Sequence, residues 1–301
     1  MPNYFIALDG GGSKTHAVLF NQEHKELVQF IGKGTNFATD FEQAISNLQA
    51  TVDGLLKTAN IKKIQRSDCH LLGGFAGVNV PAVADRLRIW QHDFKQFDFT
   101  TDLHLSVYAA SDSQYGSAII TGTGSCALAI TPETEIMLGG HGLLLGDQAS
   151  GAWIGKRLVE HSLLALDGFE SMSNIVNQVM QASQCQTATE LCQYWLKAAP
   201  AEYAKLTPYF FESIAHSDPI SLKILDQAIA YLSQLISRLS DLSSNPIYLM
   251  GGIASKLAKH LPSESQSQVI VNNIAPVYGA FQLLNTKPIQ TNNKSLTSGV
   301  F

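Results

Sequence analysis

Two glycine-rich segments carry residue types suited to binding phosphate. The first runs Asp9-Gly-Gly-Gly-Ser-Lys-Thr15, and the second, much later in the chain, runs Thr121-Gly-Thr-Gly-Ser125. Glycines let backbone N–H groups approach an anion closely, and a lysine can neutralise phosphate charge. The pair predicts a nucleotide site in which both segments hold one triphosphate.

The first segment departs from the two most familiar phosphate loops. A Walker A loop has the order G-x-x-x-x-G-K-[ST] and leads into a helix. Here Ser13 precedes the lysine, and the residues Thr15–Phe20 that follow predict a strand. A Rossmann loop also leads into a helix, and it has a third glycine where this chain has Thr15. The sequence therefore favours a glycine hairpin between antiparallel strands, with a hairpin that merely turns the chain as the alternative.

The elements that would position these hairpins occur twice in one order: strand, glycine turn, strand, strand, helix, strand, helix, strand. The first copy has expected strands at 4–9, 15–20, 26–31, 70–75 and 97–102, with helices at 41–59 and 81–90. The second copy has expected strands at 117–121, 126–130, 135–138, 247–250 and 269–271, and a final helix at 277–284. A segment at about 150–245 interrupts the second copy and reads as helices throughout.

Composition excludes several function classes. The 301 residues carry a net charge of −5, from 20 basic and 25 acidic residues, and no basic run stands out. Nucleic acid and membranes are therefore not expected partners. The absence of a signal peptide and of an 18-residue apolar run predicts a cytoplasmic protein. The cysteines form no CxxC pair, which argues against a zinc site and indicates a reduced chain: Cys69, Cys126, Cys185 and Cys192.

Six motifs, spread over nearly the whole chain, resemble one known family when taken together. They are Asp9–Thr15, Thr101-Asp102, Thr121–Ser125, Gly139-Gly-His-Gly142, Leu145-Gly-Asp-Gln-Ala-Ser-Gly151 and Gly251-Gly-Ile-Ala254. The set resembles the N-acetylglucosamine kinase branch of the BadF/BadG-type ATPases, in the superfamily of sugar kinases, actin and heat-shock chaperone ATPases. The bacterial glucosamine kinases look most similar, because the insert contains Trp195-Leu-Lys-Ala-Ala-Pro200, Tyr203 and Thr207-Pro208.

The resemblance implies an α/β fold of two ribonuclease-H-like domains, each a mixed sheet flanked by helices, around a central cleft. The first domain is expected at 1–113, with the first phosphate loop and the catalytic aspartate. The second is expected at 114–301, with the second phosphate loop, the helical insert and an adenosine motif, and its last helix is expected to pack on the first domain. The implied cofactors are ATP and Mg²⁺. The implied substrate is glucosamine or N-acetylglucosamine, phosphorylated on its 6-hydroxyl, with closure of the two lobes on the sugar.

Two aspartates are the candidates for the chemistry. Asp102 is expected at the end of the fifth strand, where its carboxylate would take the proton of the sugar 6-hydroxyl, and the resemblance implies the same role. Asp9 is the candidate to hold Mg²⁺ through water, since Mg²⁺ prefers oxygen ligands and keeps several waters. The alternative for either residue is an aspartate that only caps a turn.

The remaining site residues are expected to bind ATP or the sugar. The ATP contacts are Gly10, Gly11, Gly12, Ser13, Lys14, Thr15, Gly122, Thr123, Gly124, Gly251 and Gly252. The sugar contacts are Asn36, Asp102, Gly140, His141 and Asp147, since fixed polar groups recognise a polyol. Plainer interpretations stay open for Lys14 as an exposed lysine, Asn36 as a loop residue, His141 as a packing residue and Gly251-Gly252 as a tight turn.

Three departures from the family pattern concern the sugar more than the phosphates. His141 stands where the family has Trp, Gln148-Ala149 replaces Glu-Gly, and Leu103 stands where Ala is common. The first two lie near the expected sugar 2-position, so they leave the choice between a free amine and an N-acetyl group open.

Two other functions compete with a kinase. One is an ATP-hydrolysing activator of a radical dehydratase, which would need cysteines around an iron–sulfur cluster. The other is a sugar-sensing repressor, which would need a DNA-binding domain before the first strand at Tyr4. A homodimer formed through the helical insert is a further hypothesis.

Overall fold

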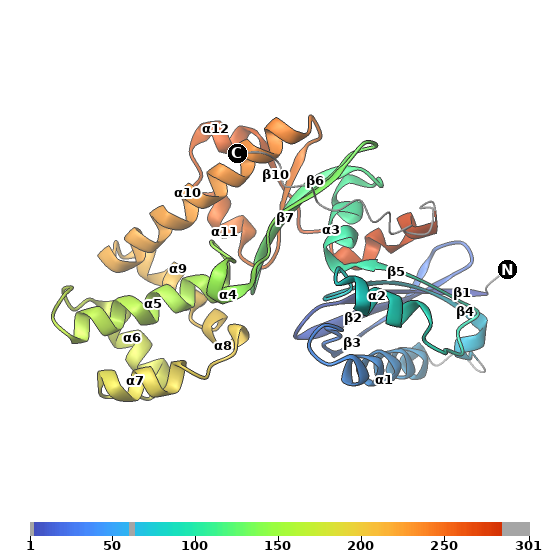
Figure 1. Cartoon of the computed structure of the whole chain (residues 1–301), viewed down its shortest axis with the longest axis horizontal. Coiled ribbons are helices and arrows are strands. Elements are labelled where there is room, and N and C mark those ends of the chain that lie inside the picture. Colours follow the sequence, from blue (N-terminus) through green and yellow to red (C-terminus); the bar gives the residue numbers. More distant parts are fainter. Residues whose placement is uncertain (1–2, 60–63, 285–301) are drawn as a thin grey trace. The chain divides into compact units, whose positions relative to one another are not determined.

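The computed structural model describes residues 3–59 and 64–284, which fall into two compact units. Unit 1 holds the chain up to Gln114 together with the segment from Ala275, and unit 2 is Tyr115–Ile274. Each unit contains a five-stranded mixed sheet flanked by helices, as predicted (Figure 1). The expected domain at 114–301 is thus divided, because its described residues 275–284 pack in unit 1. Residues 285–301 lie outside the described part.

The sheet of unit 1 has the strand order β3-β2-β1-β4-β5. Its strands are β1 (Tyr4–Gly10), β2 (Lys14–Asn21), β3 (Glu26–Lys33), β4 (Cys69–Phe75) and β5 (Gln96–Thr101). The first three form an antiparallel meander, whereas β4 and β5 run parallel to β1. Gly10 pairs with Phe75, and Phe75 pairs with Thr101, so the carboxyl ends of the three parallel strands share one edge.

Helices cover both faces of this sheet. Ile6 and Leu8 of β1 belong to one core with Leu48 and Val52 of α1 (Phe41–Ala59). Phe5 points to the opposite face, since side chains alternate along a strand, and it contacts Phe281 of the 3₁₀ helix η2 (Pro276–Leu284). This helix in turn packs on α3 (Asp102–Ser111), where a Cβ at Gly279 would come 2.4 Å from the Leu105 carbonyl oxygen. The chain's last described segment therefore supports the helix that begins at Asp102.

The expectation that Asp102 ends a strand is wrong. Strand β5 ends at Thr101, whose hydroxyl accepts the backbone N–H of His104 at 3.1 Å and so caps α3. Helix α3 itself was not expected, because it is buried without a break from Leu103 to Ala109 and so has no polar stripe to reveal its period. The helix expected at 81–90 is also shorter, since α2 ends at Arg88.

The sheet of unit 2 repeats this plan in the order β10-β9-β6-β7-β8. Its strands are β6 (Gly116–Thr121), β7 (Ser125–Ile130), β8 (Glu135–Gly139), β9 (Ile247–Met250) and β10 (Val269–Val271). The short helix α4 (Gly142–Leu145) follows β8, and the short helices α11 (Ala254–Ala258) and α12 (Ser263–Ser267) lie between β9 and β10. Strands β6, β7 and β8 form an antiparallel meander, and β9 and β10 extend the sheet in parallel from β6.

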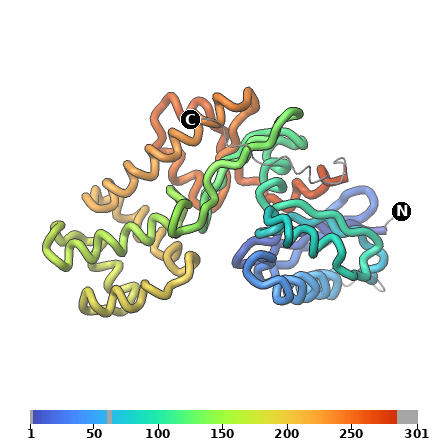
Figure 2. The backbone as a smooth tube through the Cα atoms, in the orientation of Figure 1, coloured from blue at the N-terminus to red at the C-terminus, as the bar shows by residue number. Residues whose placement is uncertain are grey.

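The predicted insert is helical throughout, and its path is followed from green to orange in Figure 2. It comprises α5 (Gly151–Leu166), α6 (Asn174–Ser183), α7 (Ala188–Trp195), α8 (Pro200–Ala204), α9 (Thr207–Ala215) and α10 (Pro219–Leu242). Leu158 and Ile224 of these helices share one core with Ile119 and Leu249 of the sheet. The insert is therefore packed onto unit 2 as part of one body. Within the described residues, no helix is long and apolar enough to cross a membrane.

Candidate active site

The first glycine segment is the turn of the β1–β2 hairpin. Gly10 pairs with Thr15, and the Gly11 N–H donates to the Lys14 carbonyl at 3.0 Å, which closes the turn. Gly12, Ser13 and Lys14 are exposed at its tip, while Thr15 is buried. Because β2 continues directly from this turn, no helix follows the loop, as the sequence predicted.

The loop after β3 runs beside this turn and carries Asn36. The Thr35 N–H donates to the Gly11 carbonyl at 3.0 Å, and the two hydroxyls of Thr15 and Thr35 lie 3.0 Å apart. The Asn36 side-chain oxygen accepts the Ala38 N–H at 3.0 Å, so this oxygen stabilises its own loop. The side-chain NH₂ is the donor that a ligand would meet.

Asp9 and Asp102 lie near the same edge of unit 1. Asp9 shares the face of β1 that carries Phe5, and this is the face that η2 and α3 cover. Burial, and next the charge of Asp102, raise the pKa of Asp9 to about 7, and nearby Lys14 acts in the opposite direction. Burial also raises the pKa of Asp102, while the backbone N–H of Leu103, which donates to its carboxylate at 3.0 Å, lowers it. The charge of Asp102, at the start of α3, thus disfavours the ionised form of Asp9.

This pair fits a divalent cation. The described residues contain no group of three or more His, Cys, Asp or Glu side chains that could hold a metal by themselves. A Mg²⁺ ion that keeps waters and binds phosphate oxygens needs only one or two carboxylates from the protein. A cation beside Asp9 would also offset the burial and the charge of Asp102, which together raise the pKa of this aspartate.

The second glycine segment is the turn of the β6–β7 hairpin, and it rests on the beginning of α5. The carbonyls of Gly122 and Thr123 accept the N–H groups of Gly151 and Ala152 at 2.7 and 3.1 Å. The Thr121 hydroxyl donates to the Ala149 carbonyl at 2.6 Å. These bonds tie the hairpin to the motif Leu145–Gly151 that precedes the helix.

Both hairpins offer backbone donors to a ligand. In the part of the chain that the structure describes, no acceptor is bonded to the N–H of Gly12, Ser13, Thr123 or Gly124. These four residues are exposed or half-buried. N–H groups of successive turn residues form the concave donor sets that bind anions.

Asp147 lies directly under the second hairpin. A Cβ on Gly124 would come 3.0 Å from its Oδ2 atom, and the carboxylate accepts the backbone N–H groups of Gly142 and Ser125. Burial raises the pKa of Asp147, and these two N–H groups and the nearby His141 counteract this shift. Asp147 itself has a left-handed backbone, with φ of 58°. A strained, buried carboxylate of this kind is typical of functional sites.

The structure brings the other predicted residues of unit 2 to the same hairpin. The Gly140 N–H donates to the Ser125 carbonyl at 3.0 Å, whereas His141 is exposed. Gly251, with φ of 105°, packs on β6, where a Cβ would come 2.2 Å from the Thr121 carbonyl oxygen. The turn Gly251-Gly252 therefore requires glycine at its first position.

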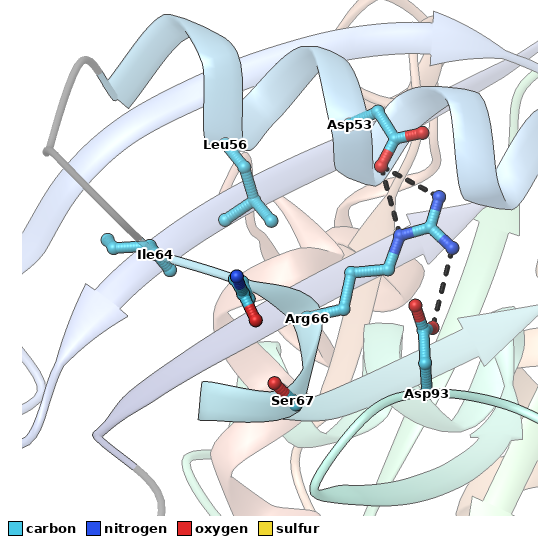
Figure 3. A pocket seen from close by; sticks show the side chains of 7 residues that line it. Asp53, Leu56, Ile64, Arg66, Ser67 and Asp93 are labelled. Atoms are coloured by element: carbon cyan, nitrogen blue, oxygen red, sulfur yellow. Dashed lines mark hydrogen bonds and ion pairs between the residues drawn. The ribbon is translucent and has the colours of Figure 1, made fainter.

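A pocket of about 560 Å³ in unit 1 contains none of the predicted residues (Figure 3). Arg66 lies between Asp53 and Asp93, with nitrogen–oxygen distances of 2.7 and 3.4 Å. Because this guanidinium already has its partners, the pocket offers a ligand little unpaired charge. The glycine hairpin remains the better candidate for ligand binding in this unit.

Tyr231 of α10 is a neighbour of the site that sequence reasoning missed. Its hydroxyl would lie 2.9 Å from a Cβ at Gly139. Burial and the charge of Asp147 raise the pKa of this phenol. Gly139 precedes the sugar-motif residues, but Tyr231 is far from it in the sequence. No local pattern links the two residues.

Comparisons with known proteins agree with this geometry. The chain is 26% identical to a glucosamine kinase of Vibrio cholerae over 92% of this chain and 94% of the relative. It is also 26% identical to an N-acetyl-D-glucosamine kinase of Dictyostelium discoideum, with 94% and 93% covered. A solved structure from Chromobacterium violaceum, proposed to be an N-acetylglucosamine kinase, superposes with a TM-score of 0.87 at 26% identity, over 94% of this chain and 99% of that one. The family model matches residues 6–281, and the chain therefore belongs to the BadF/BadG/BcrA/BcrD ATPase family.

Proposed function

We propose that this protein is an ATP-dependent amino-sugar kinase that phosphorylates the 6-hydroxyl of glucosamine or N-acetylglucosamine. The observation that carries the proposal is Asp102, a desolvated carboxylate at the beginning of α3, held in unit 1 beside Asp9 and the first glycine hairpin. The similarity to amino-sugar kinases over nearly the full length of the chain supports the choice of substrate.

Asp102 is the proposed general base. The sugar 6-hydroxyl loses its proton to this carboxylate as its oxygen bonds to the γ-phosphorus and the bond to the β-phosphate oxygen breaks. Burial makes the carboxylate a stronger base, because it raises the pKa of Asp102. The backbone N–H groups of Leu103 and of Asp102 itself donate to this carboxylate and orient it.

The phosphate groups are assigned to the two hairpins. The N–H groups of Gly12 and Ser13 in unit 1, and of Thr123 and Gly124 in unit 2, would bind the phosphate oxygens, with Gly10, Gly11, Lys14, Thr15 and Gly122 shaping the turns. Mg²⁺ would neutralise the charge of the β- and γ-phosphates when bound. Asp9 would hold its water ligands.

The adenosine is assigned to the Gly251-Gly252 turn and the pocket that follows it. This pocket of about 410 Å³ is lined by Ser255, Ala258, Lys259, Gln266, Val269 and Val271. It combines apolar side chains for a flat base with a few polar groups for its edges, which is the usual composition of small-molecule sites.

The sugar is assigned to polar groups of both units. Asn36 would donate from its side-chain NH₂, Asp147 would accept from sugar hydroxyls, and Gly140 and His141 would line the same loop. Hydroxyl-specific recognition follows, because an analogue that lacks the hydroxyl bound by Asp147 would leave this buried carboxylate without that partner.

The deciding experiment measures ADP release across a panel of hexoses that includes glucosamine, N-acetylglucosamine and glucose. We expect turnover to depend on the amino sugar. In Asp102→Asn, kcat should fall by about 10²- to 10⁴-fold with the KM for ATP unchanged, because an amide cannot take the proton. Asp226→Asn, an exposed aspartate of α10, is the matched control and should retain activity. Sugar-independent ADP release, or full activity in Asp102→Asn, would contradict the proposal.

A further inference from the structure

The hydroxyl of Tyr231 lies close to the side of Gly139 on which other residues carry a side chain. An ideal Cβ at Gly139 would come 2.9 Å from this oxygen, closer than a Cβ normally approaches. Gly139 has φ of 72°, a left-handed conformation that favours glycine. The hydroxyl therefore lies directly against the backbone of the turn that follows β8.

This turn leads to the proposed sugar residues through backbone bonds. Gly140, next to the contact, is bonded by its N–H to Ser125, whose own N–H donates to the Asp147 carboxylate. Gly142, at the other end of the turn, donates its N–H to the same carboxylate. A displacement of the turn would therefore move both donors that orient Asp147.

The chemistry of the phenol suits a fixed polar contact. Burial raises the pKa of Tyr231 most, and the charges of Asp147 and Cys126 raise it further. The hydroxyl thus keeps its proton at neutral pH and remains a donor as well as an acceptor. Tyr231 packs partly against the apolar core of unit 2, and its hydroxyl feels the charge of the Asp147 carboxylate.

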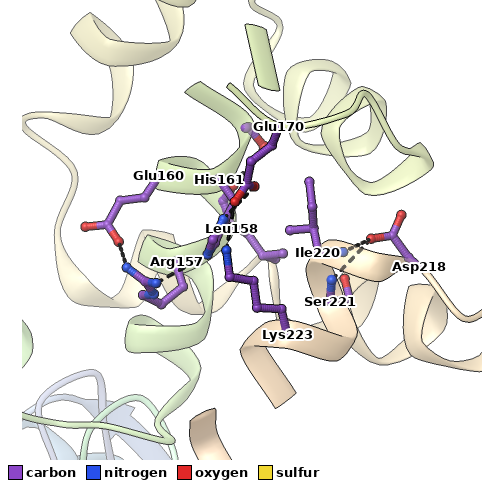
Figure 4. Close-up of polar contacts among 10 residues, drawn as sticks. Arg157, Leu158, Glu160, His161, Glu170, Asp218, Ile220, Ser221 and Lys223 are labelled. Atoms are coloured by element: carbon purple, nitrogen blue, oxygen red, sulfur yellow. Dashed lines mark hydrogen bonds and ion pairs between the residues drawn. The ribbon is translucent and has the colours of Figure 1, made fainter. Parts of the chain in front are cut away.

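Helix α10 is held firmly enough to position this side chain. Figure 4 shows Lys223 of α10 directed at Glu170, which also binds His161 of α5, at 2.9 and 2.7 Å. Asp218 caps the helix by accepting the N–H groups of Ile220 and Ser221 (Figure 4). Tyr231 follows Lys223 by eight residues, or about 12 Å along the helix axis.

We propose that Tyr231 is a positioning residue for the sugar, whose hydroxyl holds the Gly139–Gly142 turn and through it the Asp147 carboxylate. The inference rests on the proposed sugar-kinase function. It also gives the helical insert a role in that function, because α10 brings the hydroxyl to the turn. The effect is expected mainly on sugar binding, because the N–H groups of Thr123 and Gly124, which are assigned to phosphate, take no part in these bonds.

The first test is Tyr231→Phe, which removes only the hydroxyl. We expect the KM for the amino sugar to rise about 3- to 10-fold, because the turn that orients Asp147 loses the oxygen atom packed beside it. The KM for ATP and kcat should stay within about 2-fold of wild type. Tyr209→Phe, in helix α9 of the same insert, is the matched control and should leave all three constants unchanged.

The second test is a double-mutant cycle with Gly139→Ala. In wild type the new Cβ meets the Tyr231 hydroxyl, whereas in Tyr231→Phe this atom is gone and only the backbone strain of the left-handed position remains. Because the strain is common to both backgrounds, it cancels in the cycle. We expect Gly139→Ala to raise the sugar KM at least about 3-fold more in wild type than in Tyr231→Phe.

The outcomes separate the two proposals. A wild-type enzyme that phosphorylates no sugar overturns both the proposed function and this inference. An active wild type with an unchanged sugar KM in Tyr231→Phe, or with additive effects in the cycle, overturns the inference alone. A loss of thermal stability in Tyr231→Phe with equal changes in both KM values also overturns it, because that pattern indicates a purely structural role.

Discussion

At the scale of single residues, Asp9 and Asp102 give unit 1 an electrostatic cost that its fold does not require. Burial raises the pKa of both carboxyl groups, and the charge of Asp102 adds to the shift of Asp9. Nearby Lys14 only partly compensates Asp9. Such unfavourable charge is common where a site awaits a cation or a proton transfer, and it trades stability for function.

This cost predicts how the variant Asp9→Asn responds to pH. The folded pKa of about 7 lies above the ordinary value of 3.8, so the folded state keeps a proton that the unfolded chain has released. The contribution of Asp9 to the free energy of unfolding is therefore largest below about pH 4, and it is lost as the pH rises towards 7. An asparagine does not titrate. The gain in unfolding free energy of Asp9→Asn over wild type should thus be about 1–2 kcal/mol larger at pH 8 than at pH 5, after a discount for the remaining solvent exposure of this largely buried carboxylate.

Urea unfolding without Mg²⁺ or nucleotide, at pH 5 and pH 8, checks this expectation. Asp226→Asn, which makes the same change at an exposed position of α10, is the matched control. Parallel pH curves for Asp9→Asn and wild type would show that Asp9 has an ordinary pKa.

At the scale of elements, the strands were the most predictable part of the fold. Apolar runs bounded by turn residues located each of the ten strands of the described residues to within one or two residues. Helix α3 was missed because it is buried on all sides and lacks an amphipathic pattern. For the same reason, the position of Asp102 was misread, since a residue between a strand and an unrecognised helix looks like a strand end.

Contacts between distant elements are what the sequence could not supply. Tyr231 reaches Gly139 only because α10 packs across unit 2, and neither residue type signals the contact. The residues of the two hairpins were found because their glycines and hydroxyls are contiguous. Local chemistry is thus readable in the sequence, whereas the residues that support it from other elements are not.

The contact between the Gly251 turn and strand β6 gives a prediction at this scale. In Gly251→Ala the new Cβ would lie 2.2 Å from the Thr121 carbonyl oxygen, at a φ of 105°. We expect a loss of about 2 kcal/mol or more of unfolding free energy and a higher KM for ATP, because the second hairpin must shift. Gly252→Ala is the stability control, since its Cβ meets nothing within 4 Å. Equal stability of the two variants, measured by chemical unfolding, would contradict this packing.

At the scale of the whole molecule, the candidate ATP residues are divided between two units with separate cores. Gly10–Thr15 belong to unit 1, and Gly122–Gly124 and Gly251-Gly252 belong to unit 2. The polypeptide leaves unit 1 at Gln114 and returns to it at Ala275, where η2 packs against α3. Each unit has its own core of apolar residues.

Amide hydrogen exchange tests this division of the triphosphate site. An unreactive ATP analogue with Mg²⁺ should slow exchange in peptides that cover Gly11–Lys14 and in peptides that cover Gly122–Gly124, because their exposed N–H groups would become bonded to phosphate oxygens. Peptides from the outer turns of α1 serve as the internal control and should exchange unchanged. Adding glucosamine should then slow exchange around Asp147 without altering the adenosine turn at Gly251. Protection of only one hairpin would contradict the two-hairpin site, because each segment would then merely turn its own pair of strands.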